Sequence, residues 1–407
     1  MATRGGSLQS LRRTNQEQLL TLLITEGPLH RAQLARMAGV SRTTVSTISA
    51  ELIGLGLVTE SEPGSGVDGR AREILSVAPS VAVVGGIDFT LTDIHCQLSD
   101  LAGRPLSDEG TKVPSDASAD QRLAAAMALL DRLLAKSGHA RNQVLGLCLG
   151  VPGQISRATG VVGLSLPGQP WVGVDVRGKA AELIDAPLFV ENNTRLEAVA
   201  ESMFGAGRDC ENFLYVGLSS GIGSGMFLDG TLYRGADGVA GELGHVSVDP
   251  HGMPCPCGNV GCLVQYASVP AVLAALRPVM GEGVTVDEVL ASAQEGGRAA
   301  SGVLADAGAV VGRVLANLVN VLNPDRIIIG GELARAGEVL LDPVRTSIAR
   351  YAMSSSKNVE VVPAVLESGS RAGALGGVAL VKQETPGLAA ALLATVRHTD
   401  AGAQAGA

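Results

Sequence analysis

Apolar residues within the first 60 positions recur at the spacing of helices. The stretch 14–27 has a broad apolar face and ends at Gly27-Pro28, which predicts a helix. A shorter helix is predicted around Leu34, and Gly39 supplies the tight turn that follows it. Ser41 can cap a third helix, whose core-facing residues fall at helical spacing: Val45, Ile48 and Leu52.

Two short strands are predicted after these helices, at 57–60 and 73–77, joined by a glycine-rich hairpin. Helices followed by a two-stranded wing predict a winged helix-turn-helix over residues 1–80, with its recognition helix in the DNA major groove. The alternative is a small helical adaptor with a flexible hairpin. The candidate DNA contacts are polar residues that start the third helix and arginines of the hairpin: Arg42, Thr43, Thr44, Thr47, Arg70 and Arg72.

From residue 81 onward, strands alternate with helices, which is the pattern of an α/β fold. A buried strand at 81–90 leads into two further paired strands, a helix at 119–137 and another strand at 144–153. The stretch 212–227 then repeats the opening pattern of a strand, a glycine-rich turn and a hairpin. Two such units in one chain predict a duplicated fold with a cleft between its halves.

These halves divide the rest of the chain into two predicted subdomains. Residues 81–200 form the first, and a final helix at about 371–384 is expected to pack back onto it. The alanine-rich segment 385–407 is predicted to be a flexible tail. Residues 201–370 form the second subdomain, with three predicted helices at about 268–280, 285–296 and 298–323.

Charge is distributed unevenly along the chain, which has a formal net charge of −9. Residues 1–80 hold eight basic and seven acidic residues, whereas the remainder holds 23 basic and 33 acidic residues. Any DNA contact is therefore expected from the N-terminal segment, with the acidic body turned away from the DNA. A secretory signal and a long uncharged apolar run are both lacking, so we expect a cytoplasmic protein with no membrane partner.

One short loop gathers four metal-ligand side chains: His245, Cys255, Cys257 and Cys262. Four nitrogen and sulfur ligands with no open position suit a closed, structural zinc site. His251 is an alternative ligand to His245, and a glycine-rich turn with free thiols is the alternative to a metal site. The three remaining cysteines stand apart and are expected to be core residues or inert thiols.

Polar residues also stand where predicted strands end. Glu191-Asn192-Asn193 comes where a strand gives way to a helix, and open α/β sheets bind ligands at that carboxyl edge. The glycine-rich turn from Ser219 to Gly225 has backbone N–H groups that could cradle a phosphate. Such turns are common between strands, so this signal alone is weak.

Several of these motifs resemble those of the ROK family of repressors, open reading frames and sugar kinases. GELGH followed by CPCGNVGC is similar to the family's Gly-Glu-x-Gly-His and cysteine motifs, and ENN to its Glu-Asn-Asp motif. The resemblance implies an actin/hexokinase-like (ribonuclease H-like) fold, with two subdomains around a sugar cleft and one structural zinc. It also implies a homodimer or homotetramer. An N-terminal winged helix is typical of the family's transcriptional regulators.

The chain departs from the kinase pattern at three places, and the first two departures predict that phosphotransfer is lost and that the protein is not an enzyme. Asp88–Thr92 replaces the kinases' Asp-x-Gly-Gly-Thr, so bulky side chains stand where glycines approach ATP. Asn193 stands where the family has the carboxylate that deprotonates the sugar. Val264 replaces a glutamate that often helps to hold the sugar. The residues that the resemblance assigns to sugar binding are Asn192, Asn193, Glu242 and His245.

The sequence therefore predicts a sugar-responsive transcriptional regulator, a repressor of carbohydrate-related genes. Operator DNA would bind the winged helix, and a sugar or sugar derivative would bind the cleft. One alternative is an ATP-dependent sugar kinase with an accessory DNA-binding domain, because the second glycine motif is retained. Another is a ligand-independent DNA-binding protein with a vestigial cleft, which Val264 suggests.

Overall fold

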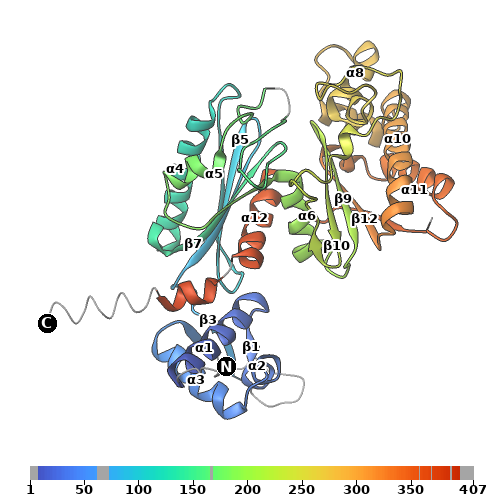
Figure 1. Cartoon of the computed structure of the whole chain (residues 1–407). Coiled ribbons are helices and arrows are strands. Elements are labelled where there is room, and N and C mark those ends of the chain that lie inside the picture. Colours follow the sequence, from blue (N-terminus) through green and yellow to red (C-terminus); the bar gives the residue numbers. More distant parts are fainter. Residues whose placement is uncertain are drawn as a thin grey trace.

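The computed structural model describes residues 8–61, 73–165, 168–356, 358–367, 369–385 and 387–394. Two larger α/β units stand side by side, and a small N-terminal unit lies beneath the first of them (Figure 1). The hairpin arginines Arg70 and Arg72 lie outside the described residues, so their predicted DNA contacts remain predictions.

Three helices and a three-stranded antiparallel sheet make up the N-terminal unit, with strand order β1-β3-β2. The Ser41 side chain accepts a hydrogen bond from the Thr44 backbone N–H, which confirms the predicted cap. Val45, Ile48 and Leu52 are buried as predicted. The elements are α1 (Leu8–Thr25), β1 (Leu29–His30), α2 (Arg31–Ala38), α3 (Arg42–Gly54), β2 (Val58–Ser61) and β3 (Ile74–Val77).

The first α/β unit has a five-stranded sheet of order β6-β5-β4-β7-β8. Its first three strands form an antiparallel meander, and β7 and β8 add to it in parallel. The helix predicted at 119–137 is present as α4 with those bounds. The elements are β4 (Val83–Phe89), β5 (Asp93–Asp100), β6 (Pro105–Lys112), α4 (Ala119–Ser137), a 3-10 turn (Arg141–Gln143), β7 (Val144–Val151), α5 (Val176–Ala181), β8 (Leu188–Asn192) and α6 (Asn193–Phe204).

The second unit repeats this topology with strand order β11-β10-β9-β12-β13. An antiparallel meander again meets two parallel strands, which confirms the predicted duplication. Its elements are β9 (Phe213–Leu218), β10 (Ile222–Leu228), β11 (Thr231–Leu232), a 3-10 turn (Leu243–His245), α7 (Val264–Ala267), α8 (Val269–Met280), α9 (Val286–Gln294), α10 (Arg298–Leu322), β12 (Arg326–Gly330), a 3-10 turn (Glu332–Ala336), α11 (Glu338–Tyr351) and β13 (Glu360–Pro363).

The three helices predicted in this unit are present as α8, α9 and α10, but α11 was not predicted. Pro343 interrupts its helical pattern, and packing against α10 stabilises the helix nevertheless. Gly312 of α10 allows the close approach, since a Cβ there would lie 2.5 Å from the Val344 carbonyl oxygen. By length and composition α10 could cross a membrane, yet half of its most apolar window is buried within the protein, as in a core helix.

Helices α6 and α12 (Ser370–Glu384) lie between the two sheets (Figure 1). A Cβ at Gly86 of β4 would lie 1.9 Å from the Ala374 carbonyl oxygen, so α12 packs directly on the strand. The prediction of a flexible tail from residue 385 is wrong for 388–394, which are helical. Leu388 and Leu392 are buried there, because they pack into an apolar cluster that also includes core residues of the N-terminal unit.

Candidate functional site

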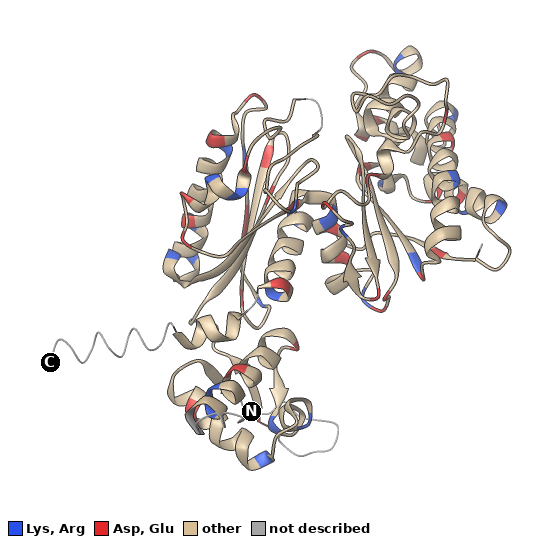
Figure 2. Cartoon of the chain, in the orientation of Figure 1, with Lys and Arg blue, Asp and Glu red and all other residues tan. Residues whose placement is uncertain are grey.

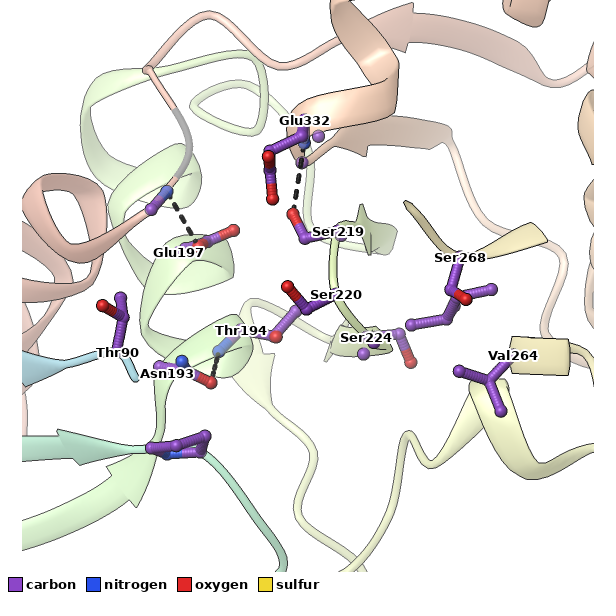
Figure 3. Close-up of a pocket in the computed structure, with 18 of the residues that line it drawn as sticks. Thr90, Asn193, Thr194, Glu197, Ser219, Ser220, Ser224, Val264, Ser268 and Glu332 are labelled. Atoms are coloured by element: carbon purple, nitrogen blue, oxygen red, sulfur yellow. Dashed lines mark hydrogen bonds between the residues drawn. The ribbon is translucent and has the colours of Figure 1, made fainter. Parts of the chain in front are cut away.

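A cleft of about 1890 Å³ opens between the two α/β units. Residues from both units line it, including the turn after β4, the start of α6, and the glycine-rich turn before β10 (Figure 3). The zinc-motif loop and Gly330-Gly331 complete its wall. Candidate ligand-binding side chains from distant parts of the sequence therefore share one cavity, as expected at the carboxyl edges of parallel strands.

Asn192 and Asn193 lie at the junction of β8 and α6, and both line the cleft. Asn192 is the N-cap of α6: its Oδ1 accepts from the Arg195 backbone N–H, and its Nδ2 donates to the Gly153 carbonyl oxygen at 3.0 Å. The Oδ1 of Asn193 accepts from the Thr194 backbone N–H at 3.0 Å. Because that oxygen is engaged, the Asn193 amide offers mainly N–H donors to a ligand.

The predicted metal ligands come together, with their ligand atoms all within 4.8 Å of one another: His245, Cys255, Cys257 and Cys262. The Sγ atoms of Cys257 and Cys262 are 3.7 Å apart, and Nδ1 of His245 is 3.6 Å from Sγ of Cys255. Two thiolates bound to one tetrahedral zinc at about 2.3 Å stand about 3.8 Å apart. The donor set and its spacing therefore fit zinc.

Two thiols of this cluster have shifted pKa values. Burial, reinforced by the neighbouring thiols, raises the pKa of Cys262 to about 12. Burial also opposes ionisation of Cys255, but hydrogen bonds, the largest from the Cys257 backbone, lower its pKa to about 7. A cation bound at the cluster would favour the thiolate form, which is the form in which cysteine binds zinc.

Glu242 lies beside this cluster and opens onto the cleft. Its carboxylate oxygen is 4.0 Å from the Arg195 guanidinium, and its side chain is 31% exposed, so it can accept hydrogen bonds from a ligand. His245 lines the same wall with Nδ1 turned to the cysteines. If Nδ1 binds the metal, Nε2 is the ring nitrogen left to donate to a ligand.

A buried ion-pair network, which the sequence analysis did not identify, supports this wall. Glu191 accepts hydrogen bonds from Arg195 at 3.0 Å and from Arg234 at 2.6 Å. Arg195 also donates to the carbonyl oxygens of Gly238 and Ala240, which precede the metal loop. Arg234, Gly238 and Ala240 lie more than 40 residues along the chain from the partners they meet at the start of α6. Because the charges are buried and mutually paired, the network fixes the loop against the start of α6.

At the opposite end of the cleft, the glycine-rich turn faces α6 and the start of the 3-10 turn at Glu332 (Figure 3). The Glu332 backbone N–H donates to Ser219 Oγ at 3.1 Å. Glu197 of α6 accepts hydrogen bonds from the Tyr215 hydroxyl and from the Gly369 backbone N–H. Burial raises the pKa of Glu197 to about 7 despite these two hydrogen bonds.

The start of α3 exposes a polar face on the N-terminal unit. Arg42, Thr43 and Thr47 are exposed, and Thr44 is partly exposed. Ser46 shares the exposed face and was not predicted. Basic and acidic residues are interspersed along the ribbon of this unit (Figure 2). The arginines that form ion pairs with glutamates among its described residues are Arg12, Arg13 and Arg31, so Arg42 is not neutralised in this way.

The family model described as "ROK family" matches residues 84–384 of the chain. The chain belongs to the ROK family. This confirms the resemblance drawn from the glycine, His and cysteine motifs, and it accounts for the actin/hexokinase-like arrangement of the two α/β units. It leaves the N-terminal unit outside the match.

Full-length relatives of this ROK protein are repressors by name. The chain is 29% identical over 390 residues to the xylose repressor of Caldicellulosiruptor bescii, covering 92% of this chain and 97% of the relative. It is 28% identical over 396 residues to the DNA-binding transcriptional repressor Mlc of Escherichia coli, covering 93% and 95%. Both alignments extend well beyond the family match, so they include the N-terminal unit.

Solved ROK structures show the same arrangement. A ROK family transcriptional regulator, a homologue of the E. coli Mlc protein, superposes with a TM-score of 0.76 at 25% identity, covering 95% of this chain and 98% of that one. A ROK glucokinase from Streptomyces griseus, in complex with glucose and AMPPNP, gives a TM-score of 0.62 at 27% identity. This superposition covers 74% of this chain and 100% of the glucokinase.

The turn after β4 lines the cleft, and a buried arginine holds its backbone. Thr90 and Leu91 point their carbonyl oxygens at the fully buried Arg122, which donates to them at 3.0 and 2.8 Å. The Thr90 backbone N–H donates to the Asp93 carbonyl oxygen. Asp88 is buried behind the turn, and burial raises its pKa well above the usual range. These bonds engage the carbonyl oxygens of Thr90 and Leu91 and the backbone N–H of Thr90.

Val264, which replaces the expected glutamate, begins α7 and also lines the cleft (Figure 3). It is partly buried and packs against the apolar core of the second α/β unit. The cleft therefore has an apolar surface beside the metal loop at this point.

Proposed function

We propose that this ROK protein is a sugar-responsive transcriptional repressor of carbohydrate-related genes. The observation that carries the proposal is the combination of an exposed polar helix start at Arg42 with a sugar-type cleft whose catalytic-base position holds Asn193. The full-length match to named repressors supports it. Operator selection from genomic fragments tests it, and failure to enrich any fragment would contradict it.

The N-terminal unit is proposed to be a winged helix-turn-helix that places α3 in the major groove. Its helices, three-stranded sheet and exposed α3 face support this assignment. Side-chain contacts at the start of α3 read base edges, and hairpin arginines contact the backbone or minor groove. The proposed contacts are Arg42, Thr43, Thr44, Thr47, Arg70 and Arg72, with Ser46 added from its exposure.

The effector is proposed to be a sugar or sugar derivative held at the β8–α6 edge of the cleft. Glu242 accepts hydrogen bonds from hydroxyls, while the Asn193 amide and the free ring nitrogen of His245 donate to them. Asn192 keeps one N–H and one lone pair for the ligand beyond its capping role. A site built from such groups discriminates strongly against ligands that lack hydroxyls.

Zinc is the proposed metal, with a structural role. It would bind His245, Cys255, Cys257 and Cys262 and leave no coordination position for a reacting water. Bound there, it fixes the orientation of the His245 ring in the cleft wall.

Phosphotransfer is proposed to be lost. An amide at position 193 cannot take the proton from a sugar hydroxyl. In the turn after β4, bulky side chains stand where the resemblance to the family's sugar kinases expects glycines. The alternative kinase function rests on the retained glycine-rich turn and on the fold shared with the glucokinase. A coupled assay of ATP consumption across a sugar panel decides between them, and turnover abolished by Glu242→Ala would establish the kinase.

The regulator is proposed to act in the cytoplasm as a homodimer or homotetramer. Two copies would present two α3 helices to an operator of approximate two-fold symmetry. A sugar that binds one closure angle of the cleft more tightly would shift the spacing of those helices, and operator affinity would change with it.

A further inference from the structure

A second cavity, of about 640 Å³, shares only the segment 365–367 with the wall of the cleft. The rest of its wall comes from the end of α1, strands β5 and β6 with the turn between them, the end of α6 and one face of α12. Ligand pockets in proteins commonly measure about 300 to 1,000 Å³. A small molecule in this cavity would contact the N-terminal unit and the first α/β unit at once.

Two buried polar side chains of β5 line this cavity. Gln97 is 7% exposed and Ser99 is 2% exposed. They lie two residues apart, so both project from the same face of the strand. Neither side chain has a hydrogen-bond partner among the described residues, although buried polar groups in folded proteins are normally paired. Both groups are therefore available to a ligand.

Lys382 of α12 brings a positive charge to the same cavity. Its ammonium lies against the turn between β5 and β6, since a Cβ at Gly103 would be 2.9 Å from Nζ. No ion-pair partner is present among the described residues. Burial lowers the pKa of this ammonium, and nearby Asp100 offsets only part of the effect. Both carboxylate oxygens of Asp100 accept hydrogen bonds from Arg104 instead. An anionic group beside Lys382 would favour its charged form.

The other charged groups that line the cavity are either paired or exposed. Asp108 is hydrogen-bonded to His95, and it also accepts from Arg371 at 3.0 Å. Glu26 and Glu367 are exposed to solvent, which screens their charges. The unpaired ammonium therefore favours a negative group in the interior of the cavity.

Apolar side chains complete the lining: Met203, Leu366, Leu375 and Val378. An inorganic ion would leave these side chains uncovered and would fill little of the volume. A ligand with a short carbon chain would cover them and gain free energy by burying its own apolar surface.

We propose that this cavity binds a small organic anion, a carboxylate or a phosphate ester with a short carbon chain, and that the bound anion regulates the DNA-binding unit. The anionic group takes hydrogen bonds from Lys382, Ser99 and Gln97, and the carbon chain covers the apolar side chains. Residues 25–27 at the end of α1 form part of the same wall. An anion that binds one position of the N-terminal unit more tightly than another changes operator affinity.

Thermal-shift measurements on the full-length protein test the site. The carboxylate probes are lactate, malate and citrate, the ester is glycerol 3-phosphate, and inorganic phosphate is the anion without a carbon chain. We expect at least one organic anion to raise the melting temperature, and calorimetry then gives its Kd. Inorganic phosphate should bind more weakly, because it leaves the apolar side chains uncovered.

Lys382→Gln should weaken binding of that anion by about tenfold or more, because the variant lacks the charge-assisted hydrogen bond. Ser99→Ala should weaken it by about threefold to fivefold, through the loss of one hydrogen bond. Both variants should fold, since each removes a polar group that has no partner among the described residues. Lys136→Gln, which changes an exposed lysine of α4 outside the cavity, is the matched control.

Fluorescence anisotropy of labelled operator, with and without the anion, measures the regulatory effect, which rests on the proposed DNA binding. We expect the anion to change the operator affinity of the wild-type protein by about fivefold or more and that of Lys382→Gln much less. Asn193→Ala should respond to the anion as the wild type does, because Asn193 lines the cleft and not this cavity.

The proposed site is wrong if no probe raises the melting temperature, or if Lys382→Gln binds the anion as tightly as the wild type. Inorganic phosphate that binds as tightly as every organic anion overturns the ligand class. A bound anion that leaves operator affinity unchanged overturns the regulatory role. A protein that selects no DNA contradicts the proposed function, and the thermal-shift measurements still decide whether the anion site exists.

Discussion

Arg234 and Glu384 connect the wall of the cleft to the C-terminal end of α12, with Nη2 and Oε1 2.8 Å apart. The same guanidinium donates to Glu191, which also holds Arg195 next to Glu242. A few residues beyond Glu384, the helical segment 388–394 packs into an apolar cluster with the core of the N-terminal unit. Contacts from the proposed sugar site thus reach the end of α12, and residues 388–394 pack against the proposed DNA-binding unit.

Glu384→Gln is expected to weaken the effect of sugar on operator affinity by about threefold to tenfold, because coupling residues of this kind contribute modest energies. Sugar affinity itself should change little, since Glu384 is not among the residues that line the cleft. Fluorescence anisotropy of labelled operator, with and without sugar, measures the ratio of the two operator affinities. Arg345→Gln, which breaks an ion pair on α11, is the control. If Glu384→Gln leaves this ratio of affinities unchanged, the Arg234–Glu384 ion pair does not couple the sugar site to the DNA-binding unit.

Metal removal should reduce sugar binding, because zinc orients His245 in the cleft wall. Elemental analysis is expected to give one zinc per chain, and Cys257→Ser should lose both zinc and most of the sugar affinity. Cys210→Ser should retain both, because Cys210 lies outside the cluster. Full sugar affinity in a zinc-free variant would show that the metal has no part in the site.

Glu197 should make stability depend on pH. Its pKa is raised from 4.5 to about 7, so folded protein keeps a proton that the unfolded chain releases between these values. The associated stability is complete below 4.5 and is lost as the pH rises through about 7. The ionisable groups that face or influence it are Tyr215 of β9, Glu201 of α6 and Asp88 of β4.

Glu197→Gln keeps an uncharged group at every pH, so the neighbours titrate in both proteins and the difference isolates Glu197. We expect the two melting temperatures to agree near the ordinary glutamate pKa of about 4.5 and the variant to melt higher above about pH 7. Differential scanning calorimetry across this range is the measurement. A difference that stays constant with pH contradicts the raised pKa.

Arg42→Ala should weaken operator binding by about tenfold and relax base preference at one position of each half-site, as expected when a base contact is lost. Arg13→Ala is the control, because Arg13 is exposed on α1 and already paired with Glu17. Equal losses of operator affinity in the Arg42→Ala and Arg13→Ala variants would place Arg42 outside the DNA interface. A uniform loss across operator sequences, with a smaller salt dependence, would make it a phosphate contact.

Local rules were sufficient for much of this fold. Ser41 before Val45 and Ile48 specifies the start of α3 by capping and periodicity, and the repeated strand and glycine pattern specifies the duplication. Segments that depend on tertiary packing were missed. Helix α11 contains Pro343 and is stabilised against α10, and residues 388–394 become helical where their leucines find an apolar partner.

The residues of the candidate site also fall into those that local sequence predicts and those that depend on tertiary packing. The metal cluster was predictable because its ligands are close in sequence and their chemistry is distinctive. Glu191 was noted at this edge of the sheet, but its pairing with Arg195 and Arg234 was missed because Glu191 and Arg234 are more than 40 residues apart and the pairing depends on burial. Asn192 was assigned from its motif alone, and its capping bonds at the start of α6 became visible only in the structure.

Operator affinity measured in the presence and absence of the sugar that binds the cleft tests the central claim most directly. The protein should bind one selected DNA fragment specifically, and the sugar should change that affinity by about fivefold or more, the range of ordinary allosteric coupling. Asn193→Ala should abolish the response while leaving sugar-free DNA binding intact. Specific DNA binding that no sugar alters, in folded protein shown to bind that sugar, would contradict the account.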